Sequence, residues 1–283
     1  MSLRKLFALF ISLFSFQAFS QTTGTEDQVK AVTIPGTQQL KIQSTIVSNQ
    51  EYVLHVNLPS DYYSNSSKRY PVIYLLDSQW DFPLLSAIYG QQYYDKLIPE
   101  AVIIGITWGG TNPDYDKLRA RDLTPTPGGS AGDYGNAAKF LAFIKNELSP
   151  FIESRFRIKE NDRGLVGSSL GGLFTLYALF NETDFFRRYF LTSPAVQWDN
   201  NYIFRLESDF YKKRKQLPVR LYMAVGGFEN VSLFREWEGV LKKRNYEGLK
   251  LNTKVLEGIG HSGSKAEGYT RGIQWVFDKE QAN

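Results

Sequence analysis

Two runs of uninterrupted apolar residues constrain the fold of this chain more than any other feature. They are YPVIYLL at Tyr70–Leu76 and AVIIGIT at Ala101–Thr107. A strand with one face in water alternates polar and apolar residues, whereas a continuous β-branched run is typical of a strand covered on both faces. Such coverage is usual in parallel sheets, because the connections between their strands place helices on both faces. The two runs therefore predict the centre of a parallel sheet.

Helical patterns alternate with strand patterns along the rest of the chain. Shorter strand candidates are Arg163–Val166, Phe190–Thr192, Val219–Val225 and Leu249–Leu256. Apolar residues at helical spacing occur in Phe140–Ile152, Leu170–Phe180, Leu233–Arg244 and Gly268–Lys279. Alternation of this kind predicts right-handed crossovers and a mostly parallel central sheet flanked by helices.

The segments Gln39–Val47 and Glu51–Leu58 differ from these strands because they alternate polar and apolar side chains. That pattern is typical of half-buried antiparallel strands. We therefore expect an antiparallel N-terminal strand pair beside the parallel sheet. Since no linker divides the chain, we expect one α/β domain over residues 39–283.

The sequence around Ser169 combines a short strand, a tight turn and a helix. Gly167, Ser169 and Gly171 match the pattern G-x-S-x-G, and the helical segment LFTLYALF follows. In this context the serine sits on a sharp strand-to-helix turn, where the glycines let strand and helix approach closely. The helix start also supplies free N–H groups and a positive dipole where an oxyanion would develop. We interpret Ser169 as a nucleophile. The alternatives are a turn without chemistry and the neighbouring Ser168, which lacks the glycine spacing.

A serine hydroxyl needs a base to become nucleophilic near neutral pH. The chain has two histidines, His55 and His261, and His261 alone follows Ser169. It lies in the glycine-rich loop 257–263 after the last strand candidate, where catalytic groups collect in parallel sheets. His261 is therefore the predicted base. His55 lies inside an alternating strand, and we expect no catalytic role for it.

A carboxylate that orients the histidine should follow the strand Val219–Val225. Glu229, in the loop 226–230, is our choice. Weaker candidates are Asp199, Glu236 and Glu238. A Ser–His dyad without a carboxylate is a further alternative.

The oxyanion formed during acyl transfer needs two backbone donors. One should be the N–H of Leu170, the residue after the nucleophile. The other should come from the loop Asp77–Trp80 behind the strand Tyr70–Leu76, and we select Gln79. Because only main-chain groups are needed, the side chains there give little information.

Composition excludes most other chemistry. The chain has no cysteine, which removes disulfides, thiolate metal sites and cysteine nucleophiles, and two histidines cannot form a three-histidine metal site. No metal or organic cofactor is implied. With 33 basic and 29 acidic residues the net charge is +4, and no basic stripe indicates nucleic-acid binding. The implied partner is a small-molecule ester, and no feature points to an oligomeric state.

The N-terminus has the pattern of a secretory signal. Arg4 and Lys5 precede the apolar run Leu6–Phe19, and the small residues Ala18 and Ser20 suit a cleavage site. The run is shorter than the roughly 20 residues of a membrane span, so we expect cleavage and no stable span afterwards. We assign residues 1–20 to a signal peptide and 21–38 to a polar leader, and expect a periplasmic or secreted protein. The alternative is an uncleaved anchor.

Five segments together resemble the putative-esterase (esterase D-like) family of α/β hydrolases, and within it the enterobactin/salmochelin-type ferric-siderophore esterases. They are YPVIYLLD (70–77), RARDLTPT (119–126), FLAFIKNEL (140–148), VGSSLGGL (166–173) and Ser193-Pro194. The resemblance implies an α/β-hydrolase fold and hydrolysis of a carboxylic ester through an acyl-enzyme. The chain departs from the family at Ser168, where histidine is common, and at Ser78, where glycine is common. Neither position supplies a reacting group.

The resemblance also suggests contacts with the substrate. Arg119 and Arg121 could hold an anionic siderophore, or they could pair with Asp122 and other carboxylates and fix the loop. Trp80 and Trp198 follow strand candidates and would suit an aromatic acyl group, although plain packing explains them equally well.

Several functions compete with siderophore cleavage. They are feruloyl or acetyl polysaccharide ester hydrolysis, acyl transfer of the mycolyltransferase type, and a non-catalytic binding protein on the same fold.

Overall fold

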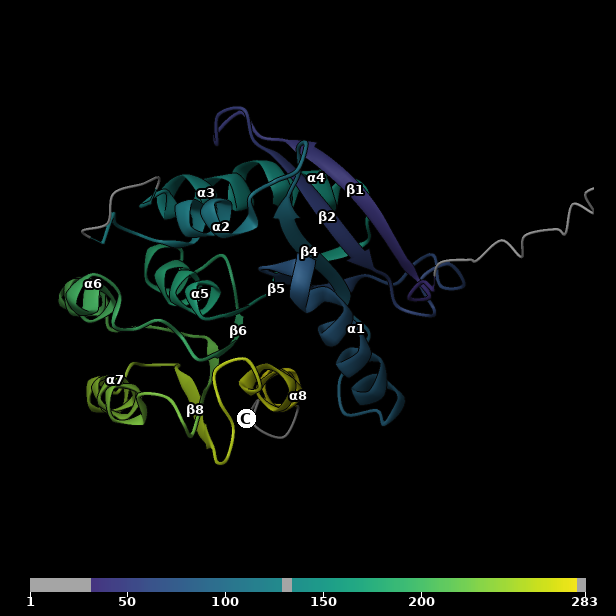
Figure 1. Cartoon of the computed structure of the whole chain (residues 1–283). Helices are drawn as coiled ribbons and strands as arrows, with labels where there is room; N and C mark the ends of the chain where they lie inside the picture. Colours follow the sequence, from purple (N-terminus) through teal and green to yellow (C-terminus); the bar gives the residue numbers. More distant parts are fainter. Residues whose placement is uncertain (1–31, 129–133, 279–283) are drawn as a thin grey trace, which may run out of the picture. The chain divides into compact units, whose positions relative to one another are not determined.

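The computed structural model describes residues 32–128 and 134–278. Its strands are β1 (Thr37–Gln43), β2 (Glu51–Asn57), β3 (Tyr70–Leu75), β4 (Val102–Trp108), β5 (Ile158–Ser168), β6 (Arg188–Thr192), β7 (Arg220–Gly226) and β8 (Lys250–Leu256). They form one sheet in the order β1-β2-β4-β3-β5-β6-β7-β8 (Figure 1). The pairs β1–β2 and β2–β4 are antiparallel, and the remaining pairs are parallel. The predicted mostly parallel sheet with an antiparallel N-terminal pair is confirmed.

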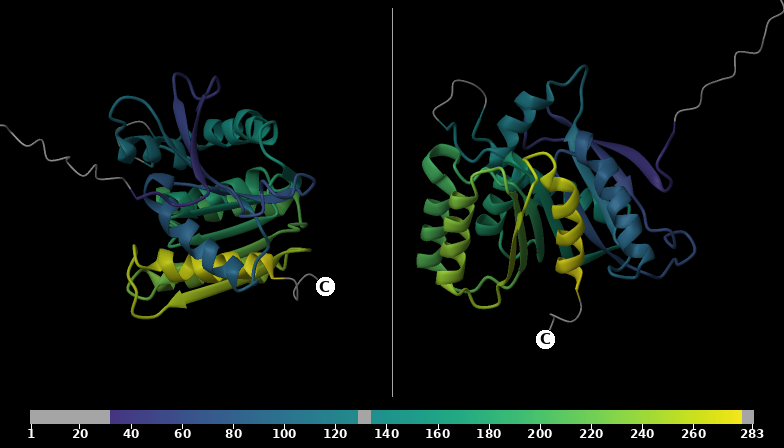
Figure 2. Two further views of the ribbon diagram at one scale, coloured as in Figure 1. Left: turned by 90° about the vertical axis from the view of Figure 1, so that its right-hand side faces the viewer. Right: turned by 60° about the horizontal axis from the view of Figure 1, so that its bottom comes forward.

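Helices cover both faces of this sheet. They are α1 (Ser78–Tyr94), α2 (Tyr115–Leu123), α3 (Ala137–Phe143), α4 (Ser149–Glu153), α5 (Leu170–Asn181), α6 (Trp198–Lys213), α7 (Val231–Arg244) and α8 (Ser264–Phe277), with a π-helical turn, Ile144–Leu148, joining α3 to α4. Helices α1 and α8 lie side by side on one face (Figure 2). Their apolar side chains form one core with the sheet, and the other helices pack into a second, larger core on the opposite face.

The two apolar runs lie where the sequence places them. Every residue of β3 and β4 is buried, because helices cover both faces of these strands. The helix α1 was not expected, since its apolar residues do not form one stripe and Pro83 lies inside it. The residues Asp77–Trp80, expected to form a loop, are instead the cap and first turn of α1.

The N-terminal assignments fall mostly outside the described residues. This applies to the proposed signal peptide, residues 1–20, and to most of the leader, residues 21–38. The first strand begins at Thr37, two residues before the expected domain start. In the described part of the chain, the helices lack the combination of length and apolar character that crossing a membrane requires.

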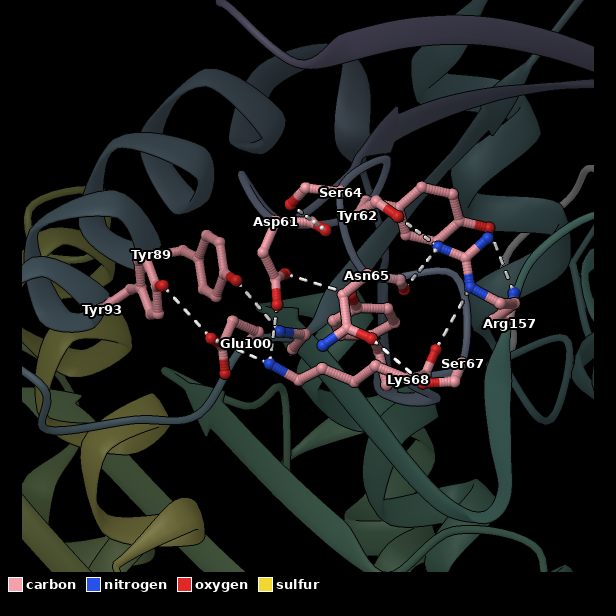
Figure 3. A network of polar contacts seen from close by, with 12 residues as sticks. Asp61, Tyr62, Ser64, Asn65, Ser67, Lys68, Tyr89, Tyr93, Glu100 and Arg157 are labelled. Atoms are coloured by element: carbon pink, nitrogen blue, oxygen red, sulfur yellow. Dashed lines mark hydrogen bonds and ion pairs between the residues drawn. The ribbon is translucent and has the colours of Figure 1, made fainter.

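A polar network lies at the end of the sheet where the parallel strands begin (Figure 3). Lys68, just before β3, pairs with Asp61 at 2.8 Å and with Glu100 at 2.9 Å. Arg157, just before β5, donates from Nε to the carbonyl of Lys68 at 3.2 Å. Tyr93 on α1 also donates to Glu100, at 3.2 Å. These contacts hold the N-terminal ends of the strands together. The predicted catalytic and substrate-binding residues all lie at the opposite end of the sheet, where the parallel strands end.

Candidate active site

Ser169 occupies the turn between β5 and α5 in a strained backbone conformation. Its φ is 59° and its ψ is −118°, a sparsely populated positive-φ conformation that costs a non-glycine residue about 1–3 kcal/mol. Backbone hydrogen bonds hold it there, from its N–H to Thr192 O at 3.1 Å and from Ala195 N–H to its carbonyl at 3.1 Å. A Cβ on Gly167 would lie 2.5 Å from the backbone of Gly171, so the turn needs glycine at that position. This is the geometry that the G-x-S-x-G pattern predicts.

The neighbouring Ser168 has a different environment. It is the last residue of β5 and is 2% exposed, and its Oγ is enclosed without a hydrogen-bond partner in the described chain. Ser169 is partly exposed. Because a nucleophile must reach the substrate carbonyl, the geometry favours Ser169 over Ser168.

His261 and Glu229 meet at the carboxyl ends of the last two strands. Glu229 lies in the loop between β7 and α7, and His261 lies in the loop between β8 and α8. His261 Nδ1 is 2.5 Å from Glu229 Oε2, and the two side chains are 50% and 17% exposed. A carboxylate at Nδ1 fixes the ring orientation and leaves Nε2 as the proton-accepting nitrogen.

The second oxygen of Glu229 is also occupied. Its Oε1 accepts hydrogen bonds from the hydroxyl of Ser193 at 2.5 Å and from the N–H of Gly226 at 2.8 Å. Burial raises the pKa of Glu229, but the hydrogen bonds from Ser193, His261 and Gly226 outweigh burial and lower it below its ordinary value. Glu229 is therefore ionised at neutral pH, as a group that orients a histidine must be.

The two expected oxyanion donors lie at the starts of two helices. Leu170 is the first residue of α5, and Gln79 is the second residue of α1, so their N–H groups have no acceptor within their own helices. The strands β3 and β5, which lead into these helices, are neighbours. Asp77, which caps α1, has a left-handed φ of 54°. The side-chain amide of Gln79 is enclosed without a partner among the described residues.

Arg119 forms an ion pair close to the start of α1. Its Nε and Nη2 donate to the two carboxylate oxygens of Asp77 at 2.9 and 2.8 Å. Its guanidinium also lies 5.6 Å from the ring centroid of Trp80, which makes an edge contact with Tyr115. Trp80 is 48% exposed. Arg119 therefore lies beside the first turn of α1, which contains both Gln79 and Trp80.

Arg121 faces a different and fully buried carboxylate. Its Nε and Nη2 contact Asp122 at 2.7 and 2.8 Å. The same carboxylate accepts from Tyr52, Trp108 and Asn136. Arg121 thus has the loop-fixing geometry that the sequence offered as an alternative to substrate binding.

Trp198 packs against the loop between α2 and α3. Its Nε1 donates to Thr126 Oγ1 at 3.1 Å, and a Cβ on Gly128 would lie 2.5 Å from its ring. Gly128 has a φ of +63°, so glycine is needed there on both counts. The indole therefore fastens this loop to the start of α6.

The weaker carboxylate candidates have other surroundings. Asp199 pairs with Arg205 at 3.4 Å, and Glu238 pairs with Arg235 and Lys242 on α7. Glu236 is exposed on the same helix. Among these carboxylates, Glu229 is the one that the described structure brings to His261.

The second histidine lies on the sheet. His55, on β2, shares a hydrogen bond of 3.1 Å between its Nδ1 and Ser78 Oγ, and burial lowers its pKa. Within residues 32–128 and 134–278, no three histidine or carboxylate side chains gather in an arrangement that would hold a metal ion.

Two serines that sequence reasoning missed complete the polar contacts of the histidine loop. Ser193 follows β6, and Ser264 is the first residue of α8. Ser193 belongs to the Ser193-Pro194 segment of the family resemblance, which is the sequence signal for it. Nothing in the sequence distinguishes Ser264 from other serines.

The fold and this geometry define an α/β hydrolase of the carboxylic-ester class. The chain belongs to the family described as "Putative esterase", whose model matches residues 44–242. It is 31% identical to the ferri-bacillibactin esterase BesA of Bacillus subtilis (strain 168), over 70% of this chain and 73% of that protein.

Two further comparisons agree with this assignment. A siderophore triacetylfusarinine C esterase of Aspergillus fumigatus is 27% identical over 67% of this chain and 66% of the relative. The crystal structure of an IroE-like serine hydrolase from Shewanella oneidensis superposes with a TM-score of 0.73 at 28% identity, covering 85% of this chain and 80% of that one.

Proposed function

We propose that this chain is an exported serine esterase that hydrolyses a siderophore ester through Ser169, His261 and Glu229. One observation carries the proposal: the Glu229–His261 pair lies at the carboxyl end of the parallel strands, the same end at which β5 leads into the strained turn at Ser169. A base oriented by a carboxylate, at the same end of the sheet as a partly exposed serine on a strand-to-helix turn, suits acyl transfer.

The reaction divides into two acyl-transfer steps. In the first, Ser169 Oγ attacks the ester carbonyl while His261 Nε2 takes the hydroxyl proton. The N–H groups of Leu170 and Gln79 stabilise the oxyanion, and the leaving alcohol takes the proton from His261. In the second step, water attacks the acyl-enzyme while His261 takes its proton, the bond between the acyl group and Ser169 Oγ breaks, and His261 returns the proton to Oγ as the carboxylic acid leaves.

The substrate class is supported by the relatives and by the surroundings of the site. Of the relatives above, one is named as a siderophore esterase and another as a ferri-bacillibactin esterase. Exposed aromatic rings at Trp80 and Phe228, which are 48% and 79% exposed, offer flat apolar faces to a ligand. Trp198 and Arg119 are further proposed contacts, although the guanidinium of Arg119 is already paired with Asp77.

Turnover of a short p-nitrophenyl ester by the mature protein tests the mechanism. The wild type and Ser168→Ala should hydrolyse it, whereas Ser169→Ala should lose at least about a thousandfold in kcat. Equal activity of Ser169→Ala and the wild type would contradict the nucleophile assignment.

A second panel tests the substrate class. It compares ferric siderophore esters with a feruloyl ester and an acetylated sugar, each with and without an added alcohol acceptor. Siderophore cleavage should exceed the other reactions in kcat/KM. Preferred cleavage of the feruloyl ester, or a product acylated on the acceptor, would assign the chain to another esterase or to an acyltransferase.

Export is proposed from the N-terminal pattern at residues 1–20. The full chain carrying a C-terminal tag should appear in the periplasm or medium with its N-terminus near residue 21, as determined by mass spectrometry. An intact N-terminus in the membrane fraction would indicate an uncleaved anchor instead.

A further inference from the structure

A chain of two hydroxyls connects Glu229 to the backbone of the histidine loop. The hydroxyl of Ser193 donates to Glu229 Oε1 at 2.5 Å, and its oxygen lies 2.7 Å from Ser264 Oγ. Ser264 Oγ in turn lies 2.7 Å from the carbonyl oxygen of His261. Ser193 and Ser264 are 3% and 0% exposed, so water does not compete for these contacts.

Counting protons fixes the direction of the Ser193 hydroxyl. An ionised carboxylate can only accept, so the proton of Ser193 lies toward Glu229. The carbonyl of His261 can also only accept, which leaves the one proton of Ser264 to be shared between that carbonyl and Ser193 Oγ. When Ser264 donates to Ser193, the two bonds run in the same direction toward the carboxylate, and each polarises the other. Ser193 therefore favours the ionised form of Glu229 directly, and Ser264 adds to this effect when its proton points toward Ser193.

The backbone at Ser193 indicates that its side chain is needed. Its φ is 48°, in the left-handed region, where glycine would fit without strain. A hydrogen bond of 2.7 Å from its N–H to Ala224 O holds this conformation. The next residue, Pro194, packs closely on Gly172: a Cβ added to Gly172 would lie 2.9 Å from the proline Cα. A serine in a place suited to glycine is explained by the bond that its hydroxyl makes to Glu229.

We propose that Ser193 and Ser264 are positioning residues that hold Glu229 ionised and aligned with His261. The inference rests on the proposed function, because it assigns a role within that site. Neither hydroxyl needs to touch substrate. Their effect reaches the reaction through the proton affinity and the orientation of the Glu229–His261 pair.

Loss of the Ser193 hydroxyl has a directional effect on this pair. A carboxylate that loses a hydrogen-bond donor holds its negative charge less stably and attracts a proton more strongly. The imidazolium form of the neighbouring ring then gains stability. We therefore expect the Glu229–His261 pair to take up its proton at higher pH in Ser193→Ala than in the wild type, by about 0.5–1 pH unit.

An NMR titration of the imidazole signals tests this inference without any substrate. The chain has two histidines, so a His55→Gln background leaves the signal of His261 alone. The variants compared are Ser193→Ala, Ser264→Ala and, as a control, Ser262→Ala, an exposed serine next to His261. The titration midpoint should rise most in Ser193→Ala, less in Ser264→Ala and not at all in the control.

Ester turnover by the same proteins completes the test. In Ser193→Ala, kcat should fall about tenfold, KM should stay within twofold, and the acidic limb of the pH profile should move up with the NMR midpoint. A fall in kcat with an unchanged titration midpoint would show that the serines serve only packing, and it would overturn the inference. An unchanged midpoint with unchanged turnover would overturn it too. Absence of turnover in the wild type would instead contradict the proposed function, while the titration would still decide the role of Ser193.

Discussion

The guanidinium of Arg119 holds the carboxylate of Asp77 through two parallel hydrogen bonds, 2.9 Å from Nε and 2.8 Å from Nη2. The two side chains are 16% and 3% exposed, and burial of a charged pair is tolerated only when the geometry is this good. The contact joins α2 to the left-handed N-cap residue of α1, two residues before Gln79. An arginine that could be expected to hold an anionic substrate therefore already holds an internal anion.

Replacing Arg119 should separate these two roles. Arg119→Met leaves the Asp77 carboxylate buried without its partner, which should lower the free energy of unfolding by about 3 kcal/mol. Arg119→Lys keeps the charge but loses the two-point contact, so its loss should be smaller. Urea unfolding at neutral pH measures both. A stable Arg119→Met protein with a raised KM for anionic esters alone would show that substrate binding is the main role.

The Glu229–His261 contact predicts a large kinetic effect. Glu229→Gln removes the negative charge and offers Nδ1 an amide in place of a carboxylate, so the ring loses its fixed tautomer and the stabilisation of its charged form. We expect kcat to fall by about 10³–10⁴, with KM little changed. The matched control is Glu236→Gln, on the exposed side of α7. Activity of Glu229→Gln within threefold of the wild type would indicate a Ser–His dyad.

The contacts of the Glu238 carboxylate predict that the stability of the folded protein depends on pH. Its carboxylate lies 2.6 Å from both Arg235 and Lys242. Burial raises its pKa, but hydrogen bonds from Lys242, Thr253 and Arg235 outweigh burial and lower the pKa from 4.5 to about 2. A carboxyl whose pKa is depressed by folding stabilises the protein above its unfolded pKa, and this stabilisation is lost as the pH falls toward the folded value.

The matching experiment is urea unfolding of the wild type and Glu238→Gln between pH 7 and pH 3. Because Arg235 and Lys242 are 51% and 65% exposed, water and salt screen the pair. The variant should therefore be about 1–2 kcal/mol less stable at pH 7. The difference should shrink steadily below about pH 4.5, where the unfolded carboxyl takes up its proton. A difference that stays constant down to pH 3 would show that packing, not charge, makes Glu238 important.

The sequence predicts this fold where the signal is local. The central strands β3 and β4 are continuous apolar runs, and the turn at Ser169 combines glycine spacing with a strand and a helix. Both kinds of pattern lie within a dozen neighbouring residues. The parallel order of the strands then places the loops that contain Glu229 and His261 at the same end of the sheet as the turn at Ser169.

Contacts between distant segments explain what the sequence did not predict. Helix α1 is apolar without a clear stripe and is stabilised by burial against the sheet and α8, so local periodicity misses it. The pairing of Arg119 with Asp77 and of Ser193 with Glu229 depends on which strand ends become neighbours. The left-handed turn at residues 199–201 has a local signal in its Asp-Asn-Asn sequence, since Asp and Asn tolerate that conformation better than most other non-glycine residues, but the same residues also occur in ordinary turns.

A buried cluster behind the site leads to the last prediction. Asp81, in the first turn of α1, accepts from Lys265 at 2.7 Å and from Tyr269 at 2.7 Å, both on α8. Asp81 and Tyr269 are 2% and 0% exposed. Burial raises the pKa of Asp81 despite the hydrogen bonds from Lys265 and Tyr269, so the charged pair does not fully offset the cost of its own desolvation. The cluster joins the helix that contains Gln79 to the helix that follows His261.

Removing one member of this cluster should therefore be worse than removing two. Asp81→Ala leaves Lys265 and the Tyr269 hydroxyl without their acceptor and should lower the free energy of unfolding by about 3–5 kcal/mol. The double variant Asp81→Ala/Lys265→Met also removes the unpaired ammonium of Lys265, so its free energy of unfolding should be higher than that of Asp81→Ala. Thermal and urea unfolding of both variants and of Lys265→Met form a double-mutant cycle that isolates the pair. Additive losses would mean that Asp81 and Lys265 act independently and that the contact between α1 and α8 depends on the apolar packing around them.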